Sequence, residues 1–188
     1  MMMVIRIIHY LRARIRKYFL EEIWFEDYIR MGMRIGDHCS IQPGVIFDYS
    51  HCWLIKIGNN VTIAPQAYLL THDASTKKTN NYTKVGSITI EDNVFIGARA
   101  LIMPGVTIGK NSVVAAGSIV TKSIPEGSIA AGNPAKVIST TEKYIEKSNE
   151  LMNSTKVYDR RYTLSGKISS LDKMKMYEEL INEIGFVV

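Results

Sequence analysis

The chain has 188 residues, of which 46% are hydrophobic, and its 23 basic and 18 acidic side chains leave a net charge of +5. This composition excludes a mainly disordered chain, because the apolar content is high and the net charge is small. It predicts one globular domain with appendages. The two cysteines, Cys39 and Cys52, form neither a CxxC pair nor a zinc quartet, which favours a reducing compartment.

Residues 1–33 are predicted to form an N-terminal amphipathic helical segment, because apolar residues recur at near-helical spacing. The segment lacks the unbroken apolar run of a membrane span, and its arginines interrupt the apolar part that a signal peptide needs. Two roles stay open: a cap over the end of the following domain, which we favour, or a peripheral contact with the inner membrane face. The basic residues concerned are Arg6, Arg12, Arg14, Arg16 and Lys17.

A six-residue period dominates residues 34–138. A helix of about 3.6 residues per turn cannot keep such a period on one face. The aliphatic positions are Ile35, Ile41, Phe47; Ile57, Ile63, Leu69; and Ile90, Ile96, Ile102, Ile108, Val114, Val120. Three residues further on, glycine or asparagine recurs, and both types tolerate the positive φ of a sharp corner. These predicted corners are Gly44, Asn60, Asn93, Gly105, Asn111 and Gly117.

A solenoid explains this period, with three short strands per coil and the aliphatic residues pointing inward. Residues 34–138 then make about four to five coils of about 18 residues. Two segments interrupt the six-residue period. The segment 48–56 has a few residues too many for one face of a coil, and the polar segment between Leu69 and Ile90 is expected to form an extruded loop.

The remaining residues, 139–188, are predicted to form a C-terminal helical tail. Residues 139–153 have a helical and polar pattern, and residues 154–167 are expected to be a loop. A second helix is expected to follow, with Ser169 or Ser170 as its N-cap and Gly185 as its stop.

The sequence resembles the hexapeptide-repeat acetyltransferases, in particular the galactoside and maltose O-acetyltransferases and their relatives in bacterial polysaccharide biosynthesis. The resemblance is carried by THDAS, by the run ITIEDNVFIGARALIMPGVTIGKNSVVAAGSIVTKSIP, and by AAGNPAKVI. It implies a left-handed parallel β-helix, a cytoplasmic homotrimer with active sites between subunits, and acetyl-CoA as co-substrate without a metal. The acceptor it implies is a saccharide hydroxyl.

The resemblance assigns catalysis to His72, because the catalytic histidine of these enzymes lies at the start of an extended loop. Histidine suits a general base because its ordinary pKa is about 6.5. The residues alone allow a plainer interpretation, in which His72 is a corner residue like His38. Asp48 precedes it by one coil and is a candidate to orient its ring; Asp73 or a main-chain carbonyl are the alternatives.

The resemblance also implies a donor site. Ala98 matches the position whose main chain meets the thioester, and Ala116 matches a contact with the pantetheine arm. Thr121, Lys122 and Lys136 match residues near the adenosine phosphates, which an ammonium group can bind. Packing for the alanines and solvation for the lysines are the alternatives. A second basic residue of the galactoside enzymes is replaced by Ser139.

The acceptor site does not carry over in the same way. The sugar-contacting asparagine and aspartate of the galactoside enzymes align near Ile46 and Cys52, so a simple galactoside is not expected. Aromatic and polar residues near the two interruptions are the local candidates for sugar contacts. They are Asp48, Tyr49, His51, Trp53, Tyr82 and Lys84.

Other functions stay open at this stage. The acceptor could be an amino group on an amino sugar or nucleotide sugar, and the coil could be a non-catalytic scaffold. A zinc enzyme of the same architecture needs three histidines in matching positions, which His38, His51 and His72 do not occupy. Nucleic-acid binding is not expected, because the first twenty residues hold a single local cluster of basic side chains, which is a weak signal for it.

Overall fold

The computed structural model describes residues 23–188. The chain divides into two compact units, Met1–Thr140 and Thr141–Val188, which we describe separately. Most of the predicted N-terminal segment, including its cluster of basic residues, lies outside the described residues. Of that prediction the structure describes only the end, where helix α2 (Phe25–Arg30) stops two residues before Gly32.

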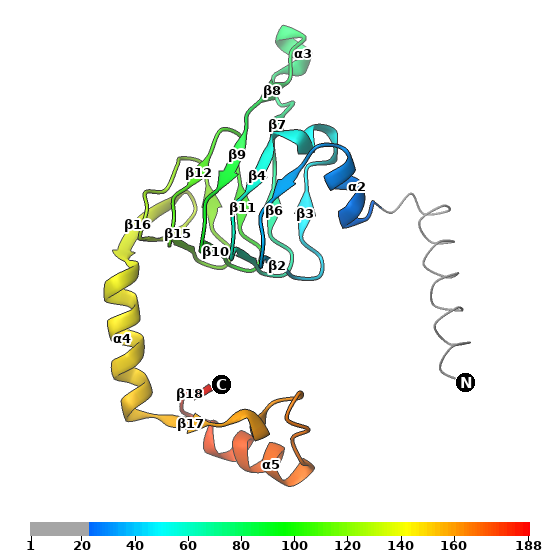
Figure 1. Ribbon diagram of the computed structural model, residues 1–188. Coiled ribbons are helices and arrows are strands. Elements are labelled where there is room, and N and C mark those ends of the chain that lie inside the picture. The colour runs from blue at the N-terminus through cyan, green and yellow to red at the C-terminus, as the bar shows by residue number, and fades with distance from the viewer. Residues whose placement is uncertain (1–22) are drawn as a thin grey trace, which may run out of the picture. The chain divides into compact units, whose positions relative to one another are not determined.

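Three sheets of very short strands build the first unit (Figure 1). The first sheet contains β1 (Arg34–Ile35), β4 (Ile55–Ile57), β9 (Ile88–Ile90) and β12 (Thr107–Ile108). The second contains β2 (Ser40–Ile41), β5 (Thr62–Ile63), β10 (Phe95–Ile96), β13 (Val113–Val114), β15 (Ser128–Gly132) and β16 (Ala135–Thr140). The third contains β3 (Ile46–Phe47), β6 (Tyr68–Leu69), β11 (Leu101–Ile102) and β14 (Ile119–Val120). Within these three sheets all pairs are parallel except β15 with β16, so the prediction of a mainly β chain of parallel strands is confirmed.

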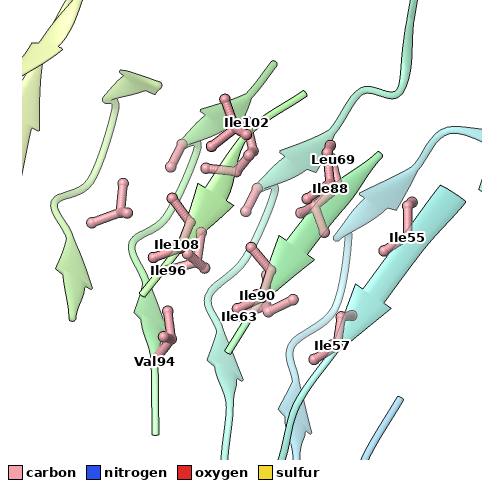
Figure 2. Close-up of a cluster of buried hydrophobic side chains, with 14 of the residues drawn as sticks. Ile55, Ile57, Ile63, Leu69, Ile88, Ile90, Val94, Ile96, Ile102 and Ile108 are labelled. Carbon is pink, nitrogen blue, oxygen red and sulfur yellow. The ribbon is translucent and has the colours of Figure 1, made fainter. Parts of the chain in front are cut away.

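The strand register stacks the predicted aliphatic residues in columns. In the first sheet Ile35 pairs with Ile57 and Ile57 with Ile90, and the same alignment recurs in the other two sheets. Successive residues of a strand point to opposite faces, so one residue of each pair enters the core. Figure 2 shows the isoleucines of neighbouring strands side by side in this core.

The corner positions have the predicted conformation. All six predicted corners have positive φ, from 55° at Asn60 to 86° at Gly105. The structure adds two that the sequence analysis did not include, Gln66 with φ of 63° and Arg99 with φ of 59°. They lie on successive coils, where Arg99 Nε donates a hydrogen bond of 2.7 Å to Gln66 Oε1. This hydrogen bond joins two residues of types that rarely adopt positive φ.

Both predicted interruptions leave the coil. The first is a 3-10 helix, η1 (Tyr49–Leu54), between β3 and β4. The second is the expected loop, an antiparallel pair of β7 (His72–Asp73) and β8 (Lys84–Val85) that carries the short helix α3 (Lys77–Asn80) and projects from the coil in Figure 1.

Helix α2 packs on the first coil. Its first turn is capped where Trp24 N donates to the Asp27 carboxylate at 3.0 Å. The rings of Phe25 and Tyr28 lie 5.9 and 5.4 Å from the ring of buried Phe47. These contacts shield part of the apolar end of the coil.

The second unit contains α4 (Thr141–Ser154), β17 (Lys156–Tyr158), η2 (Arg160–Tyr162), α5 (Ser170–Glu179) and β18 (Gly185–Val187). Ser169 is the N-cap of α5, where its hydroxyl accepts from Asp172 N at 3.1 Å. Two predictions were wrong. The expected loop at 154–167 contains β17, which pairs with β18. Helix α5 ends at Glu179 with Leu180 as its C-cap, and Gly185 begins β18 instead of stopping the helix.

None of the helices found between residues 23 and 188 combines the length and apolarity that crossing a bilayer requires.

Strand β4 offers a direct test of this core. Ile55 is fully buried and the neighbouring Lys56 is exposed. Ile55→Ala should lower the free energy of unfolding by about 2–5 kcal/mol, because it removes buried contacts and leaves a cavity. Lys56→Ala should change it by less than about 0.5 kcal/mol. Urea unfolding at one fixed protein concentration measures both, and equal midpoints would contradict the assigned register.

Candidate active site

Two segments meet at the C-terminal edge of the third sheet. Asp48 directly follows β3, and Thr71 and His72 follow β6. Because β3 pairs with β6, Phe47 lies beside Leu69, and Asp48 N donates to Leu69 O at 3.0 Å. The six-residue period therefore brings together residues that are 24 positions apart.

The Asp48 carboxylate is the centre of a hydrogen-bond network, and its side chain is only 2% exposed. Its Oδ2 accepts from Thr71 N at 2.9 Å, from Thr71 Oγ1 at 2.7 Å and from His72 Nδ1 at 2.5 Å. Its Oδ1 accepts from Ser50 N at 3.0 Å and from Ser50 Oγ at 2.7 Å. Both oxygens are thus satisfied by donors from the two segments.

The network keeps Asp48 ionised. Burial opposes its negative charge, but hydrogen bonds from Thr71, His72 and Ser50 outweigh burial and hold the pKa of Asp48 well below its ordinary value. An ionised carboxylate can only accept hydrogen bonds. Each group that contacts it must therefore donate.

This requirement assigns the tautomer of His72. Its Nδ1 must carry the proton that it donates to Asp48, which leaves the lone pair of Nε2 free in the neutral ring. The His72 side chain is 32% exposed, so the ring is partly accessible. A neutral imidazole held in this way can accept a proton from a bound hydroxyl.

The plainer interpretation of His72 as a corner residue is wrong. His38 does have the positive φ of a corner, 57°, but His72 lies in strand β7. The alternative partner Asp73 accepts a hydrogen bond of 2.9 Å from Ser75 N. Asp48 is the carboxylate that contacts the His72 ring.

The acceptor candidates fall into two groups. Helix η1 places the His51 ring 5.8 Å from His72 and 5.2 Å from Trp53, and Trp53 and Tyr49 are about half exposed. Tyr82 and Lys84 belong to the projecting loop instead. Lys84 pairs with Asp73 across β7 and β8, and the Tyr82 side chain is largely exposed.

One group of potential metal ligands occurs among residues 23–188, formed by Asp48, His51 and His72 with ligand atoms within 4.8 Å of one another. Two ligands of one tetrahedral zinc ion at about 2.0–2.1 Å lie about 3.3 Å apart. His72 Nδ1 and Asp48 Oδ2 are 2.5 Å apart. In this arrangement these two atoms hydrogen-bond to each other and are too close together to be ligands of one zinc ion.

The donor-site candidates form a second region. Ala98 and Ala116 lie on successive coils, joined where Gly117 N donates to Ala98 O at 2.8 Å. A side chain at Gly97 would come within 2.4 Å of Ala116 N, so the coils are in close contact here. The Ala98 N–H has no acceptor within the described part of the chain.

Three further candidates are exposed. Thr121 and Lys122 follow β14, and Lys136 lies in β16. The structure does not bring the two regions together within one copy of the chain. Ala98 precedes β11 at one end of the third sheet, whereas His72 follows β6 at the other end.

Sequence reasoning missed Ser50 and Thr71. Thr71 is fully buried although polar, and Ser50 connects Asp48 with His51 and His72. The signal available was the spacing Asp48-x-Ser50, which suits a carboxylate capping the amide two residues ahead. No comparable signal marks Thr71.

Comparison with known proteins finds similarity to hexapeptide-repeat proteins and to proteins named as acetyltransferases. Residues 87–122 match the family model described as hexapeptide repeat of succinyl-transferase. A Staphylococcus aureus (strain Mu50) protein named as an acetyltransferase is 47% identical over 122 residues, which cover 53% of this chain and 61% of that protein. The chain spans about half the length of the curated relatives it matches, between 44% and 61% for the first two.

Two solved structures extend the comparison. A galactoside acetyltransferase in complex with coenzyme A is 30% identical, over 72% of this chain and 82% of that one, with a TM-score of 0.47. A polySia-specific acetyltransferase is 32% identical, over 56% of this chain and 50% of that one, with a TM-score of 0.50.

The charge of Asp48 predicts a dependence of stability on pH. Its lowered pKa means that its ionised form stabilises the folded state above about pH 4, and that this stabilisation is lost as the pH falls below the ordinary aspartate pKa of about 3.9. Asp48→Asn should lower the free energy of unfolding by about 1–3 kcal/mol at pH 7. The difference from wild type should shrink below about pH 4.

Urea unfolding between pH 3 and pH 7 measures this difference. Asp37→Asn is the matched control, because Asp37 is an exposed aspartate outside the network. A constant difference between wild type and Asp48→Asn at every pH would show that Asp48 does not depend on its charge.

Proposed function

Because this chain belongs to the hexapeptide-repeat acetyltransferases, we propose that it transfers the acetyl group of acetyl-CoA to a hydroxyl of a saccharide, with His72 as the general base. The observation that carries this proposal is the hydrogen bond between His72 Nδ1 and the ionised Asp48, which leaves Nε2 free. Asp48 acts as the residue that orients the ring and stabilises its protonated form.

The reaction is a direct transfer. His72 Nε2 accepts the proton of the acceptor hydroxyl while the oxygen forms a bond to the thioester carbon. The tetrahedral intermediate then collapses, the carbon–sulfur bond breaks, and the coenzyme A thiolate leaves with the proton that His72 returns. Asp48 stabilises the imidazolium between these steps, because it is a fixed anion beside Nδ1.

The donor region supplies the remaining parts of the proposal. The unpartnered Ala98 N–H is suited to donate to the oxyanion of the tetrahedral intermediate. Ala116 has a small side chain that lets the pantetheine arm approach the main chain. Thr121, Lys122 and Lys136 are exposed and suited to the phosphate groups of acetyl-CoA.

The site needs two copies of the chain. Ala98 and His72 of one copy lie toward opposite ends of the third sheet, which supports a site formed by two copies. We propose a homotrimer of left-handed coils in which His72 of one subunit faces Ala98 of the next. Free thiols at Cys39 and Cys52 support a cytoplasmic setting.

The acceptor is proposed to bind over the exposed aromatic residues beside His72. Trp53 and Tyr49 offer apolar faces of the kind on which sugar rings stack. Tyr82 and Lys84 extend this surface from the loop that also carries His72. Such a surface suits a polysaccharide or a lipid-linked glycan as well as a small sugar.

Removing the base should abolish transfer without weakening coenzyme binding. We expect His72→Ala to lower the rate of acetyl transfer to saccharides by about a hundredfold to ten-thousandfold. Binding of coenzyme A should be retained, because the proposed donor residues are untouched. The measurement is release of free coenzyme A with a panel of methyl pyranosides.

The control for this variant is His38→Asn, which removes a histidine at a corner where asparagine is tolerated. Its rate should equal that of wild type. Transfer by His72→Ala at the wild-type rate would remove His72 from the proposed role.

Mixed oligomers test the composite site. The variants His72→Ala and Ala98→Trp should each be inactive, the second because its tryptophan side chain would fill the proposed donor site. In trimers formed at random from equal amounts, about a quarter of the sites receive both native residues. Co-expression should therefore restore about a quarter of the wild-type activity per site. No recovery, with mixed trimers verified by mass spectrometry, would contradict a site shared between subunits.

A further inference from the structure

A second histidine, His51, is linked to the Asp48 carboxylate by hydrogen bonds through the Ser50 hydroxyl. Ser50 Oγ lies 2.7 Å from Asp48 Oδ1 and 2.9 Å from His51 Nδ1. It also lies 3.2 Å from His72 Nδ1. The two rings are 5.8 Å apart between centroids and tilted by 43°.

The proton in each hydrogen bond between Asp48, Ser50 and His51 can be assigned. Asp48 is ionised, so the single hydroxyl proton of Ser50 points toward it. Ser50 Oγ then has only lone pairs left for its other contacts. His51 Nδ1 must therefore donate to Ser50, which leaves the lone pair of His51 Nε2 free in the neutral ring.

Both histidines are thus fixed in the same tautomer by one carboxylate. Each presents an unprotonated Nε2, and each ring is partly exposed. Because the two rings are 5.8 Å apart between centroids, one ligand with two neighbouring donors can reach both lone pairs. A ligand with a single hydroxyl would bind His72 and leave the His51 Nε2 lone pair without a donor. An ether or ester on the neighbouring carbon could not donate a hydrogen bond to His51 either.

The dimensions suit two hydroxyls on adjacent carbons. Each Nε2 lies about 1 Å from its ring centroid, so the two atoms are separated by at most about 8 Å when the centroids are 5.8 Å apart. Two hydrogen bonds of about 2.8 Å and the roughly 2.8 Å between neighbouring sugar hydroxyls span such a distance. The Trp53 ring lies 5.2 Å from the His51 ring and is about half exposed, so a sugar ring can stack on it.

We propose that His51 is a specificity-determining residue that binds the hydroxyl next to the one that is acetylated, so that the acceptor is a saccharide with a free vicinal diol. The proposal rests on the proposed function, because it takes His72 as the base. It deepens that function by naming the substrate class: sugars with two adjacent unmodified hydroxyls.

The test compares pairs of acceptors. Wild-type protein, acetyl-CoA and methyl gluco- and galactopyranosides are assayed, and the acetylated position is found by NMR. The same glycosides lacking the neighbouring hydroxyl are then used. We expect kcat/KM to be about tenfold higher for the diol than for the deoxy acceptor with wild type, and this ratio to fall to about one in His51→Phe.

His38→Asn should keep the wild-type ratio, because His38 lies at a corner outside the site. A diol-to-deoxy ratio in His51→Phe that stays at the wild-type value, with both rates changed together, would mean that the variant only disturbs the fold and would overturn the assignment of His51. A wild-type ratio near one would overturn the diol while leaving the proposed function standing. No acetyl transfer to any pyranoside by wild type would overturn the proposed function and this inference with it.

Each assay is repeated with a chelator. Unchanged rates support the proton assignment given above. Loss of transfer on chelation would overturn it, because the nitrogen atoms assigned to hydroxyls would then belong to a metal ion held by Asp48, His51 and His72.

Discussion

The register between successive coils is the constraint on which the site depends. Each strand is only a few residues long, so a shift by one residue would turn the buried isoleucines outward. Extra residues are tolerated only between strands. Helix η1 and the β7–β8 loop both leave the coil after strands of the third sheet, and these strands are direct neighbours. The two insertions meet for this reason, and their first residues include Asp48 and His72.

The buried charge then organises what the register brings together. An ionised carboxylate that is 2% exposed is stable only if its oxygens are fully hydrogen-bonded. Asp48 meets this requirement with main-chain and side-chain donors from both insertions. The same bonds orient the side chains of Ser50, Thr71 and His72. One electrostatic requirement therefore fixes the ring orientation that the proposed role of His72 as a general base requires.

Much of the coil could be predicted because its signal is local and repeated. The sixth-residue aliphatic positions and the glycine or asparagine corners follow from strand geometry and from tolerance of positive φ. The corners at Gln66 and Arg99 were not predicted, because their positive φ accompanies a side-chain hydrogen bond between two coils and not a residue type that favours it. The contact of Asp48 with His72 follows from spacing, but Ser50 and Thr71 depend on the path of each insertion. Pairing of β17 with β18 joins distant residues, so Gly185 was misread as a helix stop.

The position of η1 has a consequence for how such proteins diversify. The six residues of η1 lie outside the strand ladder, and only Cys52 among them is buried. Substitutions at the other positions, such as His51 and Trp53, alter no column of the core. The coil and the insertion are in this sense separate structural modules. Under the proposed function, a change of acceptor would need substitutions only in this insertion, and the donor residues on the coil would stay as they are.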